Sequence, residues 1–316
     1  MMDWSDRHCR YFFRQLAPHA RVYTEMITTG ALIHGDVARH LDFNQAEHPV
    51  VLQLGGSEPA DLARAAKLGE SWRYDEINLN CGCPSERVQR GAFGACLMAE
   101  PQLVADCVTA IQDTVAVPVT VKHRLGVDFI EEYDFVAQFV ETLAAAGCRT
   151  FIVHARNAIL KGLTPKDNRQ IPPLKYDYVY RLKSDFPDCG IVVNGGIMTA
   201  ADALAHLERV DGVMLGRVAY HDPYVLAELD GSLFGHQPPN RHQVVERMWH
   251  YATDEVRTGT PLRAITRHML GLYHGQPRAR KWRQLLSDPV HLASNDPDLI
   301  LQAHELVEPS TTAASI

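Results

Sequence analysis

The stretch GIVVNGGIMTAADALAHLERVDGVMLGR, residues 190–217, contains a complete strand–helix–strand unit. A β-branched run ends at Asn194, apolar residues then recur at helical spacing, and a second apolar run ends at Gly216. Nearly continuous apolar runs are typical of parallel strands that are buried on both faces. The stretch therefore predicts one βα repeat of an α/β protein.

The same rhythm extends along most of the chain, and strands are expected at 21–27, 49–56, 76–82, 117–124, 150–155, 190–196 and 212–217. Their spacing of roughly 20–40 residues favours a (β/α)8 TIM barrel. The rival, a doubly wound open sheet, would usually show a G-x-G-x-x-G turn after its first strand, and this sequence has none. A barrel needs eight strands to close. We therefore expect that the first strand lies upstream of this chain or that the sheet is open at that point.

The pattern changes after about residue 235, where HQPPNRHQ reads as a linker and only helical spacing follows. The sequence thus predicts a catalytic barrel domain over residues 1–235 and a small all-helical domain over residues 236–316. No run approaches the ~20 apolar residues of a membrane span. Seven scattered cysteines without disulfide spacing, and no signal peptide, indicate a cytoplasmic protein. We expect a monomer.

In such a barrel the active site lies at the C-terminal ends of the strands. Polar residues are expected at those ends, at Gln53, Asn80, Cys83, Lys122, His154, Asn194 and Arg217 among others. The glycines at 195–196 and 216 let the backbone approach a phosphate, which indicates a flavin mononucleotide or a sugar phosphate. Lys122 would stabilise a developing anion or pair with a carboxylate. His154 would contact the ligand or be a satisfied core histidine.

Three cysteines lie on one segment, at Cys81, Cys83 and Cys96. Zinc sites usually have four ligands in paired motifs, and no second pair is present, so no metal is expected. Cys83 follows the strand and precedes Pro84, which suits a reactive thiol or a proton donor. Cys96 stands among small apolar residues, where a buried cysteine is the default.

The charge distribution points to a nucleic-acid partner although the net charge is -7. Between Val256 and Ser287 there is no acidic residue. The basic residues of that stretch are Arg257, Arg263, Arg267, Arg278, Arg280, Lys281 and Arg283. A one-signed patch on an acidic protein is typical of phosphate-backbone binding, and the alternative is a solvated helix face. Arg87, Lys166 and Arg169 on barrel loops would extend this track.

Taken together, YDEINLNCGCPSERVQRGAFGACLM, FIVHARNAILKGLTPKDNRQIPPL and DGVMLGRVAY resemble the tRNA-dihydrouridine synthases, specifically the bacterial A-type enzymes. The resemblance runs from residue 3 to about residue 287. It implies an FMN-dependent barrel with a helical tRNA-binding domain and NADPH as the reductant. It also implies that hydride goes to C6 of a flipped-out uridine of the D-loop, at positions 20 and 20a, while Cys83 protonates C5.

The resemblance further implies roles for individual residues. It assigns FMN contacts to Gln53, Lys122, His154, Asn194, Gly195, Gly196, Gly216 and Arg217. It places Asn80 beside the uracil and makes Arg87, Arg280 and Arg283 tRNA contacts. Two alternatives remain open. One is an FMN barrel that reduces a free pyrimidine or another small enone, and the other is a tRNA-binding protein without redox activity.

Overall fold

The computed structural model describes residues 1–85, Val88 and 91–308. The chain divides into two compact units. The barrel unit contains Met1–Met2 and Arg21–Gly216, and the helical unit contains Asp3–Ala20 and Arg217–Ile316. Within the described residues, no helix is long and apolar enough to cross a membrane.

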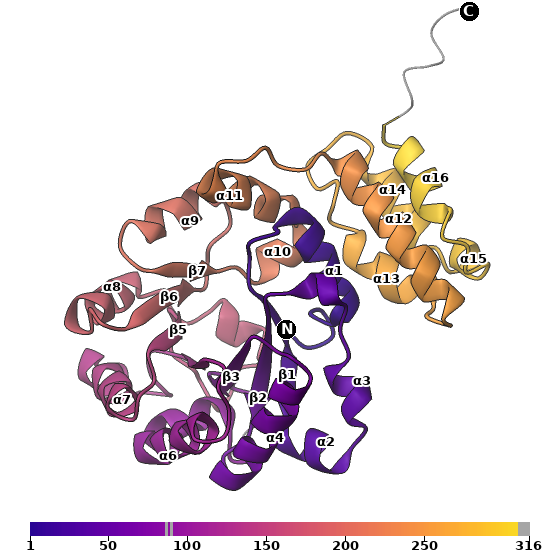
Figure 1. Ribbon diagram of the computed structural model, residues 1–316. Helices are drawn as coiled ribbons and strands as arrows, with labels where there is room; N and C mark the ends of the chain where they lie inside the picture. The colour runs from indigo at the N-terminus through magenta and orange to yellow at the C-terminus, as the bar shows by residue number, and fades with distance from the viewer. Residues whose placement is uncertain (86–87, 89–90, 309–316) are drawn as a thin grey trace, which may run out of the picture. The chain divides into compact units, whose positions relative to one another are not determined.

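The barrel unit is built on one parallel sheet whose strands pair in chain order from β1 to β7. The strands are β1 (Val22–Thr28), β2 (Val50–Gly55), β3 (Glu76–Cys81), β4 (Val119–His123), β5 (Thr150–His154), β6 (Gly190–Asn194) and β7 (Gly212–Met214). The sheet curls into an incomplete barrel, with helices outside it (Figure 1). The prediction of a (β/α)8-type barrel with seven strands in this chain is confirmed.

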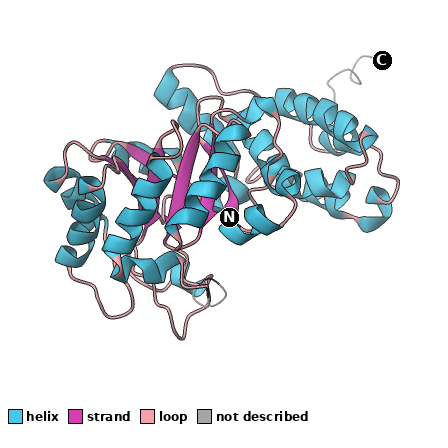
Figure 2. Cartoon of the chain, turned by 60° about the horizontal axis from the view of Figure 1, so that its bottom comes forward, coloured by secondary structure: helices cyan, strands magenta, loops and turns pink. Residues whose placement is uncertain are grey.

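Helices connect these strands and cover the sheet (Figure 2). They are α2 (Thr29–His34), α3 (Val37–Leu41), α4 (Pro59–Ser71), α6 (Pro101–Gln112), α7 (Tyr133–Ala145), α8 (Tyr176–Asp185) and α9 (Ala200–Leu207). Short 3-10 helices lie at η1 (Gln45–Glu47), η2 (Gly94–Ala99) and η3 (Asp167–Arg169). Every residue of β2 and of β3 is buried, as expected for strands covered on both faces.

The helical unit packs its own core. Its helices are α1 (Arg7–Leu16), α10 (Arg217–His221), α11 (Tyr224–Phe234), α12 (Arg241–Arg257), α13 (Leu262–Met269), α14 (Ala279–Ser287), α15 (Pro289–Leu292) and α16 (Leu299–Glu305). Trp282 is fully buried there and donates its indole hydrogen to the Met269 carbonyl at 2.9 Å. Phe12 and Leu16 of α1 join the same cluster.

This packing places the division of the chain elsewhere than at residue 235. The compact units separate after Gly216, so that α10 and α11 belong with the later helices. Residues 3–20 also belong to the helical unit, because α1 contacts α11, α12 and α13. The apolar face of α1 is therefore buried against segments that follow it by more than two hundred positions, which local sequence patterns do not reveal.

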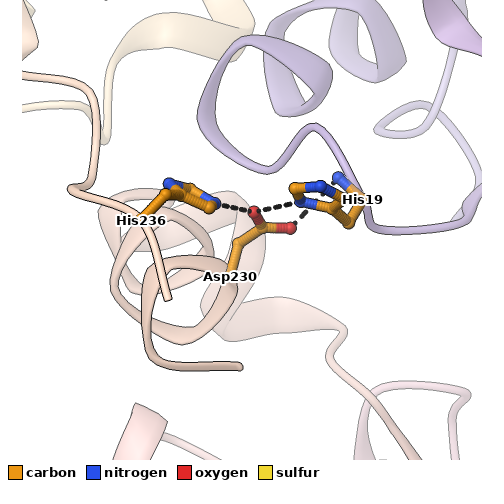
Figure 3. A group of neighbouring side chains, drawn as sticks. All are labelled: His19, Asp230 and His236. Carbon is orange, nitrogen blue, oxygen red and sulfur yellow. Dashed lines mark hydrogen bonds and ion pairs between the residues drawn. The ribbon is translucent and has the colours of Figure 1, made fainter. Parts of the chain in front are cut away.

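A polar cluster in the helical unit joins His19, Asp230 and His236 (Figure 3). The buried Asp230 carboxylate lies 2.9 Å from His19 Nδ1 and 2.6 Å from His236 Nε2, and it also accepts the His19 backbone N–H at 3.1 Å. Hydrogen bonds to the Gln237 carbonyl and to Asp230 raise the pKa of His236. Imidazole N–H groups thus satisfy the buried carboxylate, and the cluster fixes the end of α11.

Candidate functional site

The polar residues predicted at the strand ends lie on neighbouring strands of the barrel unit. The strand register pairs Gln53 of β2 with Asn78 of β3, and Asn80 of β3 with Lys122 of β4. Further along the same sheet, His154 of β5 pairs with Asn194 of β6. Because the strands are parallel, these side chains gather at one edge of the sheet, where barrel enzymes hold their ligands. We call this edge the rim.

Hydrogen bonds link the buried amides of the rim into a chain, which we call the amide relay. Asn80 Nδ2 donates to Gln53 Oε1 at 2.8 Å, and Gln53 Nε2 donates to Asn78 Oδ1 at 2.8 Å. Asn78 Nδ2 donates to Thr120 Oγ1 at 2.8 Å, and Thr120 donates to Glu76 Oε1 at 2.6 Å. The relay runs from the rim into the barrel interior, so the positions of the rim amides depend on residues below them.

Asn80 also shapes the loop that carries Cys83. Its Oδ1 accepts the backbone N–H groups of Gly82 and Cys83, each at 3.0 Å. The Cys83 carbonyl accepts the Ala95 N–H at 2.9 Å. The Cys83 side chain is half-buried. The loop therefore holds this thiol at a defined place beside the rim.

Lys122 is held in the rim by Asn194. Its Nζ donates to Asn194 Oδ1 at 3.1 Å, and Asn194 Nδ2 donates to the Met214 carbonyl at 2.7 Å. Burial lowers the pKa of Lys122 to about 7, with a further lowering by Arg124 and an opposing effect of Cys83. Lys122 is therefore a rim group whose charge a bound ligand can change.

The turn after β6 brings backbone close to His154. Gly195 and Gly196 have φ of +109° and +76°, which side-chain-bearing residues rarely adopt. A Cβ on Gly196 would lie 2.5 Å from Leu174 Cδ1 and 2.6 Å from the Tyr176 hydroxyl, and one on Gly195 would lie 3.2 Å from His154 Nε2. Tyr176 donates to the Gly195 carbonyl at 2.6 Å. The turn is a tight cradle in which glycine is required.

Arg124 braces the loop after β3 and the loop after β5. Its guanidinium donates to the carbonyls of Gly82 at 3.1 Å, Asn157 at 3.1 Å and Asn168 at 3.0 Å. Burial lowers the pKa of Arg124 to about 10, so it stays charged at neutral pH. Asn168 is fully buried and bonds both backbone groups of Ile159. The loop after β5 therefore has a fixed shape.

That loop carries two of the predicted RNA contacts. Lys166 is the N-cap of η3, Arg169 is its last residue, and both side chains are exposed. The charge of Arg169 contributes to lowering the pKa of Arg124. Arg87, the third predicted contact on a barrel loop, lies outside the described residues.

The other two cysteines of the segment differ from Cys83. Cys81 is fully buried in β3, and burial raises its pKa well above the ordinary value. Cys96 is half-buried in η2, its thiol contacts the Phe93 carbonyl at 3.1 Å, and burial raises its pKa. Neither environment favours proton transfer to a ligand at the rim.

The remaining predicted residues are dispersed. Gly216 follows β7, and a Cβ on it would meet nothing closer than Met1 Sδ at 3.9 Å, so the space beside it is open. Arg217 begins α10 in the helical unit. Arg280 and Arg283 are exposed on α14, where Trp282 between them anchors the helix in the core. Their predicted contacts with phosphate and with tRNA stay predictions.

The fold and the rim define a class: an enzyme built on an incomplete (β/α)8 barrel, with a lysine, buried amides and a loop thiol at the strand ends. Residues 1–311 match the model of the family described as "Dihydrouridine synthase (Dus)". The chain therefore belongs to the dihydrouridine synthase family.

Curated relatives are similar over nearly their whole length. A protein of Xanthomonas campestris pv. campestris is 54% identical over 96% of this chain and 91% of the relative. One of Pseudomonas syringae pv. tomato is 55% identical over 98% and 92%, and one of Escherichia coli O6:H1 is 53% identical over 97% and 93%. Each of the three is named tRNA-dihydrouridine(20/20a) synthase.

Sequence reasoning did not assign roles to Glu76 and Thr120, which end the amide relay. A signal was present in β3, where the polar Glu76, Asn78 and Asn80 alternate with Ile77, Leu79 and Cys81. Side chains at i, i+2 and i+4 of a strand share one face. This alternation within an apolar strand indicates a polar column inside the barrel.

Proposed function

We propose that this chain is a tRNA-dihydrouridine synthase that reduces uridines 20 and 20a of tRNA to 5,6-dihydrouridine. The observation that carries the proposal is the placement of Cys83. Its loop follows β3 at the rim and is fixed by Asn80, and its segment matches the dihydrouridine synthase family. Relatives that are 54% and 55% identical to this chain over the aligned residues bear the name of that activity.

The rim suits FMN as the cofactor. The positive-φ glycine turn at Gly195 and Gly196 leaves backbone exposed where a side chain would collide with Leu174, and His154 adjoins it. Such a turn after a late barrel strand is suited to a phosphate. Lys122 and Gln53 would hold the flavin ring, and the peptide segment of Gly216 and Arg217 would add phosphate contacts. These hydrogen-bond donors and cations suit the phosphate and the ring of FMN.

When bound, FMN, with NADPH as the reductant, supplies the hydride that C6 of the uracil takes up. The residues of this chain do the rest. Cys83 gives its thiol proton to C5, so that the C5–C6 double bond becomes a single bond, and the resulting thiolate regains a proton from water. Lys122 stabilises negative charge at the rim. Asn80 positions the pyrimidine, which must leave its base stack for this reaction.

The partner in this proposal is tRNA. Lys166 and Arg169 would contact its backbone near the rim, and Arg280 and Arg283 of α14 would contact it from the helical unit. These four side chains are exposed. The resemblance to the family predicts Arg87 as a further contact with the tRNA backbone.

The test is to map dihydrouridine in tRNA from cells that lack this gene. We expect that positions 20 and 20a become unmodified uridine while other dihydrouridines persist. The rival reading as a reductase of free pyrimidines predicts comparable activity on free uridine and on tRNA. The rival reading as a redox-inactive tRNA binder predicts a purified protein without flavin absorbance.

A further inference from the structure

The Asp230 carboxylate of the helical unit faces two imidazole rings (Figure 3). Its side chain is only 3% exposed. Its Oδ1 accepts the backbone N–H of His19, so Oδ2 is the oxygen that both rings approach, His19 with Nδ1 and His236 with Nε2. His19 and Asp230 lie 211 positions apart in the chain, and only the packing of the helical unit brings them together.

The Gln237 carbonyl decides which nitrogen of His236 carries a hydrogen. A carbonyl oxygen only accepts, and His236 Nδ1 lies 3.1 Å from it, so Nδ1 is the protonated nitrogen. In the neutral ring, Nε2 then directs a lone pair at Asp230 Oδ2 from 2.6 Å, and two acceptors oppose each other. A positive charge is needed between them. A proton on Nε2 is one such charge, and a metal cation is another.

The contacts around the three side chains are those of metal ligands. A metal-bound histidine usually donates its other ring N–H to a carbonyl or a carboxylate, as His236 does to Gln237. A ligating carboxylate is usually hydrogen-bonded as well, and Asp230 accepts the His19 backbone N–H. The His19 ring stacks on Phe234 with centroids 4.1 Å apart. These neighbours fix the orientation of all three groups.

The distances and the ligand types suit zinc. The three ligand atoms all lie within 4.8 Å of one another, and the two shortest separations are 2.6 and 2.9 Å. Around tetrahedral Zn²⁺ with bonds of 2.0–2.2 Å, ligand atoms are about 3.4 Å apart, so small movements complete the site. Imidazole nitrogens and a carboxylate oxygen are common zinc ligands. The His19 side chain is 47% exposed, which gives the ion and a water ligand access.

We propose that His19, Asp230 and His236 bind one Zn²⁺ ion, with water as the fourth ligand. The ion takes the place of the proton on His236 Nε2, which is released to solvent. Because it binds the folded arrangement, the ion stabilises the helical unit by joining residues 17–20 to the end of α11. The expectation of no metal was based on the spacing of the cysteines, and no cysteine belongs to this site. The site does not depend on the reductase activity proposed above.

The experiment is a Zn²⁺ titration of the untagged full-length protein after dialysis against a chelator. Calorimetry measures the zinc bound, and thermal unfolding is followed with and without zinc. The wild type should bind one equivalent, and zinc should raise its Tm. His19→Gln removes one ligand at an exposed position, so it should weaken zinc affinity by about tenfold or more and remove the rise in Tm. Asp230→Asn should do the same.

His274→Gln is the matched control in the helical unit. His274 pairs with the Asp222 carboxylate at 3.2 Å but is not part of the three-residue cluster, so this variant should bind zinc like the wild type. The His19→Gln result decides the matter even if Asp230→Asn does not fold. A wild type that binds no zinc overturns the proposal. Zinc binding that is unchanged in His19→Gln, as expected if thiols such as Cys83 held the ion, overturns it as well.

Discussion

Cys83 and Cys81 are two positions apart in the chain, yet their surroundings differ. Cys81 is fully buried in β3, and burial raises its pKa. Cys83 is half-buried on a loop fixed by Asn80. Proton transfer is therefore assigned to Cys83 alone. The proximity of the two thiols in sequence does not imply a shared role.

Replacing each thiol separately tests this assignment. Cys83→Ala should lower the rate of dihydrouridine formation by a factor of about 100 to 10,000, the usual contribution of a general acid, while flavin and tRNA binding persist. Cys81→Ala should leave the rate within about threefold of the wild type, because it removes only one buried sulfur. Single-turnover assays on tRNA measure both effects. Equal losses in the two variants would refute the division of roles.

The lowered pKa of Lys122 leads us to expect that cofactor binding depends on pH. Burial lowers its pKa to about 7 in the ligand-free protein, so it is increasingly neutral above that pH. An anionic ligand favours the charged form, and binding above pH ~7 therefore takes up a proton. FMN affinity should fall as pH rises from about 7 toward about 10, measured by quenching of flavin fluorescence.

In Lys122→Met this part of the pH dependence should vanish and the affinity should be lower throughout. Lys67→Met changes a lysine on the surface of α4 that pairs with Glu70, and it should behave like the wild type. If Lys122→Met retains the full decline with pH, another group is responsible for it.

At the scale of elements, the turn between β6 and α9 depends on glycine. Gly196→Ala would force a Cβ to within 2.5 Å of Leu174 Cδ1 at a φ of +76°. We expect a stability loss above the 1–2 kcal/mol of left-handed strain alone, and an FMN affinity reduced by about tenfold or more. Urea unfolding and flavin titration measure the two effects.

Gly162→Ala is the matched control for this turn. Gly162 has a φ of +90°, but a Cβ there meets nothing within 4 Å. It should show the strain penalty without the loss of FMN affinity. Similar FMN affinity in both alanine variants would argue against a phosphate in the β6–α9 turn.

The sequence predicted the strands of the barrel but not the hydrogen bonds that link them. The runs around β2 to β6 were predicted because buried parallel strands are continuously apolar and end in polar residues. The relay below the rim was not predicted. A hydrogen bond between neighbouring strands joins Glu76 and Thr120, and strand register is not visible in single runs.

At the scale of the whole molecule, the seven-stranded barrel was predictable and the division of the chain was not. The βα rhythm repeats locally, whereas α1 finds its partners near the other end of the chain. The separation after Gly216 therefore required three-dimensional packing. The assignment of FMN to one part of the chain and tRNA to the other stays a prediction.

The basic run of the helical unit predicts a salt-dependent tRNA affinity. Arg280 and Arg283 are exposed on α14. The double variant Arg280→Ala/Arg283→Ala should reduce the slope of log affinity against log salt by about 1.4 to 1.8, since each phosphate contact contributes about 0.7 to 0.9. Filter binding over a salt series measures it.

Arg257→Ala is the control for that series. Arg257 belongs to the same basic run but has Asp254 as a partner at 3.4 Å. Its slope should stay near that of the wild type. Equal slopes for the wild type and the double variant would exclude α14 as a phosphate-binding surface.

The most direct test of the central claim is position-resolved detection of dihydrouridine after purified wild-type protein is incubated with NADPH and unmodified tRNA. The account predicts new dihydrouridine at positions 20 and 20a, the positions in the name of the relatives, and almost none with Cys83→Ala. Dihydrouridine only at other positions, or full product with Cys83→Ala, would contradict it.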